Sequence, residues 1–267
     1  MKIKTIISAF SFIICFTGCS DRFLSAQDNP VNTSQISLAD TKKAFSELPF
    51  KTGINDFKLN APNNKTWEFR VIVPEIMENE MVPLFVNLHW SASAKDPNIH
   101  KLTDCYIEPA LENTNAYILS PNSQGLLWYN PANETQVVNL VNFALENLNI
   151  EPEKVVILGY SDGGNGSWFF SETHPELFSA SIPMASAYSP TYNSNGEIQK
   201  IDMPLYVIHG ENDELFPLIN TKVLVEQSIN AGNQIEFVIA PGLSHFVACD
   251  YLPYLQDAVE WVKTSVW

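Results

Sequence analysis

The chain has 267 residues, of which 45% are hydrophobic and 17% charged, a composition typical of a globular protein with enough apolar surface for one core. Asp and Glu total 30 against 15 for Lys and Arg, and the net charge of −15 disfavours binding to nucleic acid or to anionic lipid headgroups. Four cysteines are too few for a disulfide scaffold.

Residues 1–18 are predicted to form a secretion signal. A short basic start precedes an apolar run over 6–17, and such a run rises only about 18 Å as a helix, too short for the roughly 30 Å hydrocarbon core of a membrane. The run ends in the letters FTGC at 16–19, which resemble a bacterial lipobox. This resemblance implies that Cys19 is lipidated and becomes the mature N-terminus.

The alternative is an ordinary signal peptide cut near 24–26. With the lipobox, acyl chains anchor the protein in the bacterial cell envelope, in the periplasm or at the cell surface, and the domain itself stays in water. Residues 19–38 are polar and turn-rich without a sustained period, so we expect a flexible tether. A single domain then occupies 39–267.

Short apolar runs alternate with helical patterns along this domain. Strands are predicted over 67–73, 83–89, 116–119, 155–159, 180–184, 205–208 and 235–239, and helices over 135–148, 165–173, 218–230 and 252–263. The first strand ends at Pro74, which favours a sheet edge. The order indicates an α/β protein whose mostly parallel central sheet has helices on both faces, and ligands of such sheets bind beyond the carboxyl ends of the strands.

The sequence GYSDG at 159–163 directly follows one predicted strand and precedes a helix. A G-x-S-x-G pattern in this context indicates a nucleophilic serine, here Ser161, on a strained strand-to-helix corner. The small residues Gly159 and Gly163 let strand and helix pass close together. The alternatives are a glycine-rich turn with an incidental serine and an anion-binding loop.

The sequence HGEND at 209–213 follows the predicted strand over 205–208. A carboxylate at this place can orient an imidazole, and Asp213 is favoured over Glu211 and Glu214 because Gly210 turns the chain out of the strand before it. His209 ends a buried strand, and we expect a structural role for it.

His245 lies in the sequence GLSHF at 242–246, after the last predicted strand. A loop at this place lets a histidine reach the serine, and the chain order Ser161, Asp213, His245 is the order expected on this architecture. The other histidines, His89, His100 and His174, are interpreted as structural or solvated.

These motifs, together with the strand over 84–89 and the letters HPELF at 174–178, resemble the α/β-hydrolase superfamily. Within it the chain is similar to secreted carboxylesterases, feruloyl esterases and polyhydroxybutyrate-depolymerase-like esterases, over roughly residue 67 to the C-terminus. The resemblance implies an α/β-hydrolase fold and a serine esterase that acts through an acyl-enzyme intermediate.

One segment departs from the family pattern. The family usually has a glycine-rich HGxG sequence after the third strand, and this chain has HWSAS at 89–93. The resemblance implies that backbone N–H groups of Asp162 and of Ser91, or alternatively Trp90, form the oxyanion hole. Losing glycine restricts φ, and a distorted loop would make a slow enzyme.

Aromatic side chains are candidates for the walls of the substrate pocket. Trp90, Trp128 and Trp168 are predicted to bind substrate, and ordinary core packing is the alternative for each.

Two cysteines remain after cleavage at Cys19. Cys249 follows His245 by four residues, so a bond between Cys105 and Cys249 would restrain the histidine loop in an exported protein. Two free buried thiols are the alternative.

No spacing typical of a metal site or of a dinucleotide-binding loop is present, so no metal and no cofactor are expected. The leading hypothesis is a serine hydrolase of small-molecule or polysaccharide-linked carboxylic esters, such as acyl or feruloyl esters. The alternatives are a non-catalytic surface binding protein of the same fold and a serine peptidase.

Overall fold

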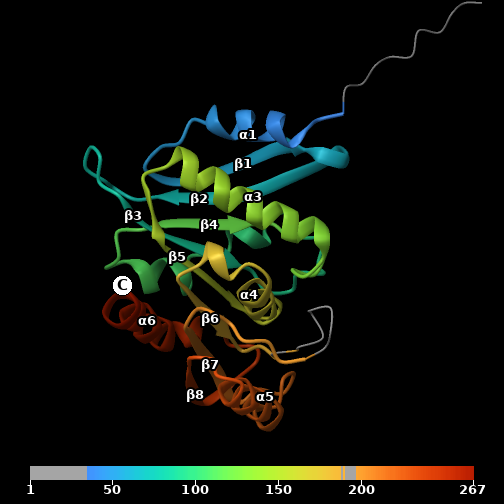
Figure 1. Ribbon diagram of the computed structural model, residues 1–267, viewed down its shortest axis with the longest axis vertical. Helices are drawn as coiled ribbons and strands as arrows, with labels where there is room; N and C mark the ends of the chain where they lie inside the picture. Colours follow the sequence, from blue (N-terminus) through green and yellow to red (C-terminus); the bar gives the residue numbers. More distant parts are fainter. Residues whose placement is uncertain (1–34, 188, 190–196) are drawn as a thin grey trace, which may run out of the picture. The chain divides into compact units, whose positions relative to one another are not determined.

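The chain folds around one central sheet. The computed structural model describes residues 35–187, 189 and 197–267, and residues 35–267 form one compact unit. The predicted signal segment, Cys19 and most of the predicted tether lie outside the described residues. Among the described residues, eight strands follow the order β1-β2-β4-β3-β5-β6-β7-β8 (Figure 1). They are β1 Gly53–Ala61, β2 Lys65–Val73, β3 Val82–Leu88, β4 Tyr117–Pro121, β5 Ile150–Tyr160, β6 Ala180–Met184, β7 Leu205–Asn212 and β8 Ile235–Ser244.

The sheet is mostly parallel, as predicted. Strands β3 to β8 run parallel to one another, whereas β1 and β2 are antiparallel to each other and β2 is antiparallel to β4. The carboxyl ends of β3, β5, β7 and β8 therefore lie along the same end of the sheet.

The strand predicted over 67–73 is not at the edge of the sheet, which corrects the expectation drawn from Pro74. This strand, β2, pairs with β1 on one side and with β4 on the other. Strand β1 is the edge, and it was not predicted because Asp56 and Lys58 interrupt its apolar residues. Phe57 and Leu59 alternate with them and turn toward the interior.

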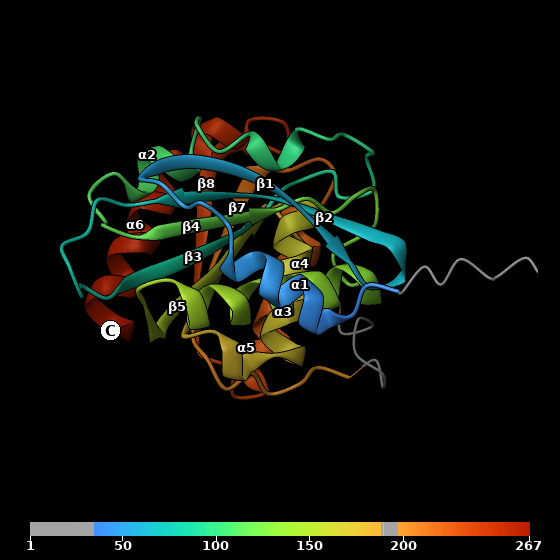
Figure 2. The same cartoon turned by 90° about the horizontal axis from the view of Figure 1, so that it is seen from above.

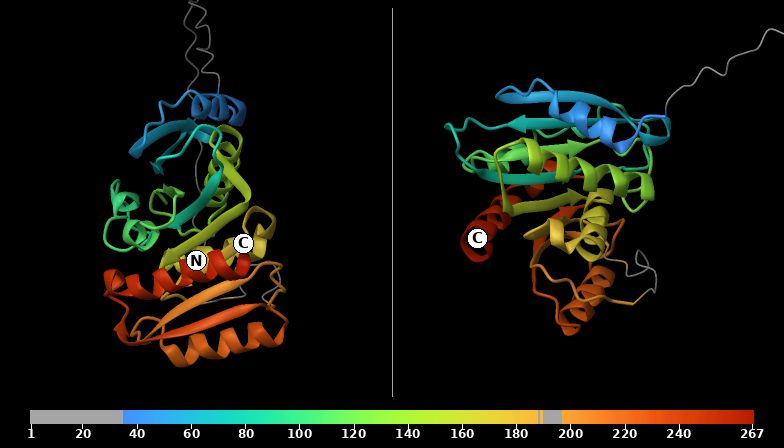
Figure 3. Two further views of the ribbon diagram at one scale, coloured as in Figure 1. Left: turned by 90° about the vertical axis from the view of Figure 1, so that its left-hand side faces the viewer. Right: turned by 45° about the horizontal axis from the view of Figure 1, so that its top comes forward.

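Helices cover both faces of the sheet. They are α1 Leu38–Ser46, α2 Ile107–Leu111, α3 Pro131–Asn147, α4 Asp162–Thr173, α5 Leu218–Asn230 and α6 Leu252–Trp261. In Figure 2, α1 and α3 lie on one side of the strands and α2 on the other, and Figure 3 shows α1 beside α3. Helix α1 begins at a capping box between Ser37 and Asp40, so helical structure starts at the end of the predicted tether.

The core has two layers because successive residues of β5 point to opposite faces of the sheet. Val155 and Ile157 belong to the apolar cluster that includes residues of α1, α3 and α4. Val156 and Leu158 belong to the cluster that includes Ile107 of α2 and residues of α6. Strand β5 is thus buried on both faces, which explains its continuous apolar sequence.

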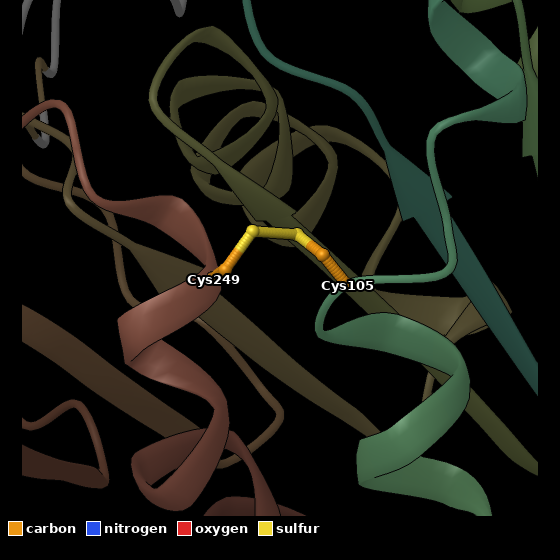
Figure 4. The surroundings of a disulfide bond; sticks show 2 residues. All are labelled: Cys105 and Cys249. Carbon is orange, nitrogen blue, oxygen red and sulfur yellow. A yellow bond between two sulfur atoms is a disulfide. The ribbon is translucent and has the colours of Figure 1, made fainter.

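A disulfide joins two segments that lie 144 residues apart in the chain. Cys105 precedes α2, and Cys249 lies in the short helix Ala248–Tyr251 that leads into α6 (Figure 4). Of the two sequence-based alternatives, the structure contains the bond and not the free thiols. The bond fastens the segment just after His245 to the α2 side of the molecule.

Among the helices of the described residues, none is long and apolar enough to cross a membrane.

Removing the disulfide is expected to destabilise the fold. Cys105→Ser should lower the free energy of unfolding by about 2–4 kcal/mol, because the bond closes a long loop in the unfolded chain. Urea denaturation measures this change. The double variant Cys105→Ser/Cys249→Ser should match the single one, and wild-type stability in both variants would refute the assignment.

Candidate active site

Ser161 lies at a sharp corner between β5 and α4. Its backbone has φ 57° and ψ −119°, a conformation that is strained for a residue with a side chain. The Ser161 N–H donates to the Met184 carbonyl at the end of β6 (2.9 Å) and so holds the corner against the sheet. Helix α4 begins at the next residue, and its first N–H groups have no partner within the helix.

Two glycines make this corner possible. A Cβ at Gly163 would lie 1.8 Å from the Leu88 carbonyl oxygen, and a Cβ at Gly159 would lie 2.3 Å from the Gly163 carbonyl carbon. Both contacts are with backbone atoms, which cannot move aside. The close approach of strand and helix predicted from the G-x-S-x-G pattern is therefore present.

The structure brings the three predicted residues Ser161, His245 and Asp213 together. Ser161 Oγ is 2.8 Å from His245 Nε2, and His245 Nδ1 is 2.8 Å from Asp213 Oδ2. An ionised carboxylate only accepts hydrogen bonds, so Nδ1 carries the proton and Nε2 is left to accept from the serine hydroxyl. The hydroxyl is thus already hydrogen-bonded to a base.

Asp213 is buried, and burial alone would raise its pKa. Hydrogen bonds from His245 and from the Phe216 N–H outweigh burial and lower the pKa of Asp213 below its ordinary value. The rival acids have other partners: Glu211 accepts the N–H of Gly242, and Glu214 accepts the N–H of His245.

His209 has a structural role, as expected. It is buried, and its Nε2–H donates to the Phe216 carbonyl at 2.7 Å. Burial lowers the pKa of His209 and keeps the ring neutral. The bond holds the turn that presents Asp213 to His245.

The loop after β3 lies beside the nucleophile. Ser91 has φ 48°, so the serine itself adopts the left-handed conformation for which the family pattern supplies glycine. The Ala92 N–H donates to Asp162 Oδ2 (2.9 Å), which ties this loop to the first residue of α4. Outside helices and strands, no backbone hydrogen bond from the N–H of Trp90 or Ser91 occurs in the described part of the chain.

His89 and Trp128 support this loop from below. His89 Nδ1–H donates to the Trp90 carbonyl (2.7 Å), and His89 Nε2 accepts the Ser123 N–H (3.1 Å). The Trp128 indole N–H donates to the His89 carbonyl (2.9 Å). Burial lowers the pKa of His89 to about 4, so the ring stays neutral and keeps both bonds at neutral pH.

A cavity of about 430 Å³ opens at the serine. It is lined by Trp90, Ser91, Tyr160, Ser161, Leu215, His245, Phe246, Ala248 and Cys249. Trp90, one of the three tryptophans predicted to bind substrate, therefore lines the cavity at the nucleophile. Leu215 and Phe246 are 54% and 70% exposed and form its apolar rim.

The other two predicted substrate-binding tryptophans are core residues, which corrects the prediction. Trp128 and Trp168 are 1% and 0% exposed and belong to the cluster on the α3 and α4 side of the sheet. Trp128 packs edge-on against His89 and over Gly166, where a Cβ would lie 2.6 Å from the Trp128 Cβ. Neither indole lines the cavity.

Sequence reasoning missed several supporting groups. The Tyr160 hydroxyl donates to the His245 carbonyl (2.7 Å), and Glu214 holds the N–H of the same residue (2.9 Å). Tyr160 occupies a variable position of the G-x-S-x-G pattern, so no sequence signal marks it. The sequence suggests Glu214 only as an alternative to Asp213 for the acid that orients the histidine.

The remaining titratable clusters offer no metal site. Within residues 35–187, 189 and 197–267, no group of three or more His, Cys, Asp or Glu side chains is arranged to hold a metal ion. His100 is buried and accepts from the Asn122 amide (2.9 Å), and His174 contacts Glu134 (2.8 Å), so both have structural partners.

A Ser-His-Asp arrangement at the carboxyl ends of β5, β7 and β8 defines a serine hydrolase of the α/β-hydrolase superfamily. The Dienelactone hydrolase family matches residues 123–267, more than half of the chain, and the chain belongs to this family. The superfamily expected from the motifs is confirmed. Ser161, Asp213 and His245 lie in the matched region, whereas Ser91 and Cys105 precede it.

Solved structures with the same fold include several esterases. A thermostable esterase is 22% identical, with a TM-score of 0.64 over 79% of this chain and 62% of that one. Thermogutta terrifontis esterase 2, phosphorylated by paraoxon, is 14% identical, with a TM-score of 0.65 over 82% of this chain and 96% of the other. S-formylglutathione hydrolase (FrmB) from Staphylococcus aureus is 15% identical, with a TM-score of 0.63 over 80% and 98%.

The chain spans 62% of the length of the thermostable esterase. At these identities the likeness shows the fold. No curated protein has significant similarity to the sequence.

The bond between Asp162 and the loop after β3 gives a test of this loop. Asp162→Ala keeps every backbone N–H group but removes the carboxylate that holds the loop after β3 beside α4. The N–H groups of this loop should then be less well aligned, and kcat/KM for an ester should fall by about tenfold to a hundredfold. Asp162→Asn keeps an acceptor oxygen and should retain most activity. Equal activity of Asp162→Ala and wild type in a nitrophenyl ester assay would show that the bond does not position the loop.

Buried neutral histidines predict an acid-sensitive fold. Burial lowers the pKa values of both His89 and His100 to about 4 from 6.5. Between pH 6.5 and 4 the unfolded chain binds protons that the folded chain does not. As the pH falls through this window, each histidine should therefore reduce the free energy of unfolding by about 1.4 kcal/mol per pH unit. Asp213, whose pKa is lowered, stabilises the fold throughout this window and loses its effect only below it.

Urea denaturation between pH 7.5 and 4.5 measures this slope. His100→Gln should lower this slope by the contribution of one histidine, about 1.4 kcal/mol per pH unit. A slope that is absent in wild type, or unchanged in the variant, would contradict the assignment.

Proposed function

We propose that the protein is a serine hydrolase of carboxylic esters. The observation that carries the proposal is the hydrogen-bonded series from Ser161 Oγ through His245 to Asp213, with both distances at 2.8 Å. The series opens into a cavity with uncharged walls. A non-catalytic binding protein has no need of a serine hydroxyl already hydrogen-bonded to an imidazole.

The mechanism follows from these positions. His245 Nε2 takes the proton of Ser161 as Oγ attacks the ester carbonyl carbon, and Asp213 stabilises the imidazolium that forms. The N–H groups of Asp162 and of Ser91 or Trp90 stabilise the oxyanion. His245 then gives its proton to the departing alcohol oxygen, which leaves an acyl-enzyme, and water releases the acyl group by the same steps.

We infer that acyl or aromatic esters, including feruloyl esters carried by polysaccharides, are the substrate class. The aromatic side chains Trp90, Tyr160 and Phe246 in the cavity support this inference. The exposed rim at Leu215 and Phe246 leaves room for a bulky alcohol outside the cavity.

Matched substrates test the reaction. The wild type should cleave 4-nitrophenyl butyrate, and Ser161→Ala should lower kcat by about a thousandfold or more while its unfolding transition stays unchanged. A fluorophosphonate should label wild type and not the variant. The 4-nitroanilide of the same acyl group, cleaved at a rate similar to the ester, would indicate a peptidase, and neither turnover nor labelling would indicate a binding protein.

We also propose that the chain is exported and anchored through a lipid on Cys19 in the cell envelope. The lipobox-like sequence at 16–19 supports this location, and a disulfide suits an oxidising compartment. Metabolic labelling with a fatty-acid alkyne in a bacterial host should mark the wild type and not Cys19→Ala. Label on the variant, or wild type found wholly in the soluble fraction, would reject the anchor.

A further inference from the structure

The cavity at Ser161 has no lysine or arginine among its lining residues. His245 and Tyr160 are its only titratable members, since Cys249 is in a disulfide. The imidazole Nδ1–H is already bonded to Asp213, and burial raises the pKa of Tyr160, whose hydroxyl donates to a carbonyl. Apart from the imidazole, which the reaction itself uses, no lining side chain offers a positive charge to a substrate.

Three carboxylates lie behind the cavity wall, each hydrogen-bonded to His245 or to the loop after β3. Asp213 is bonded to His245 Nδ1, and Glu214 accepts the N–H of His245 (2.9 Å). Asp162 reaches the loop on the other side through the Ala92 N–H (2.9 Å). Asp213 belongs to the triad, and Glu214 and Asp162 lie one hydrogen bond away from His245 and from the loop after β3, so these groups add negative charge near the cavity.

None of the lysine and arginine side chains of the described residues lines this cavity. Each of the following lies within 4 Å of a carboxylate on the protein surface: Lys42, Lys43, Lys58, Arg70, Lys101, Lys154, Lys200, Lys222 and Lys263. Lys95 lines two other cavities and Lys65 lines one of them, and Lys51 is an exposed residue just before β1. The stretch 188–196, which is only partly described, contains neither Lys nor Arg in its sequence.

We propose that this site selects uncharged esters and discriminates against esters that carry a carboxylate, with Leu215 and Phe246 as specificity-determining residues at the rim. The proposal rests on the ester hydrolase function above and names its substrate class. A substrate carboxylate that binds here loses hydration without meeting a cation. The oxyanion of the transition state adds a second negative charge nearby, so the discrimination acts on kcat/KM.

Three esters of equal length test this inference. The 4-nitrophenyl monoester of adipic acid carries an anion, its methyl ester is neutral, and an analogue ending in trimethylammonium is a cation. With rates normalised to spontaneous hydrolysis at low salt, kcat/KM for the anion should be roughly tenfold or more below that of the neutral ester. The cation should be hydrolysed faster than the anion, and 0.5 M NaCl should narrow the gap.

A positive charge placed at the rim should reduce the discrimination against the anion. Leu215→Lys should raise kcat/KM for the anion relative to the neutral ester by roughly fivefold to tenfold. Leu215→Gln, which is polar but uncharged, should not. Ile54→Lys makes the same charge change at an exposed position of β1, at the opposite edge of the sheet from β8, and should leave the ratio as in wild type.

The outcomes separate this inference from the proposed function. Hydrolysis of all three esters with equal normalised kcat/KM, or an anion preferred over the cation, would overturn the inference and leave the esterase intact. If the anion and the cation both have the same low kcat/KM relative to the neutral ester, the site discriminates against charge of either sign. That outcome also overturns the inference. Wild-type rates no higher than those of Ser161→Ala for every ester would overturn the esterase itself.

Discussion

The contact of Gly163 with the backbone of Leu88 is the constraint on which the site depends. It presses the first turn of α4 against the end of β3, with no space for a side chain between them. Ser161 and the loop after β3 consequently face each other, and the Asp162 carboxylate reaches the Ala92 N–H. A larger residue at 163 would push the helix away from β3 and separate the nucleophile from the proposed oxyanion donor of the loop after β3.

The histidine loop is fixed by groups from different parts of the chain. His245 meets Asp213 through its ring, Glu214 through its N–H and Tyr160 through its carbonyl. Cys249 ties the following turn to Cys105. Because these restraints come from β5, from the loop after β7 and from the segment before α2, the imidazole is held before any substrate binds, which lowers the cost of orienting it during the reaction.

The sequence was a good guide wherever chain order and position in the sheet determine the result. Ser161, Asp213 and His245 each follow an apolar strand, and parallel strands bring their carboxyl ends to one edge. The direction of an aromatic side chain has no such signal: Trp90 lines the cavity, whereas Trp128 and Trp168 lie in the core because Gly166 leaves room for the Trp128 side chain and because α4 turns Trp168 into the apolar cluster. Strand β1 is not predicted from the sequence because Asp56 and Lys58, which face solvent, interrupt the apolar residues that face the interior.

The disulfide also has a consequence for biosynthesis. Cys105 precedes Cys249 by 144 residues, so the bond cannot form until β4 to β8, which lie between the two cysteines, have been synthesised. Cys249 and its neighbour Ala248 are part of the cavity wall. The wall beside the nucleophile therefore acquires its covalent link only after β3 to β8 have been synthesised, and forming that link requires the oxidation of two thiols.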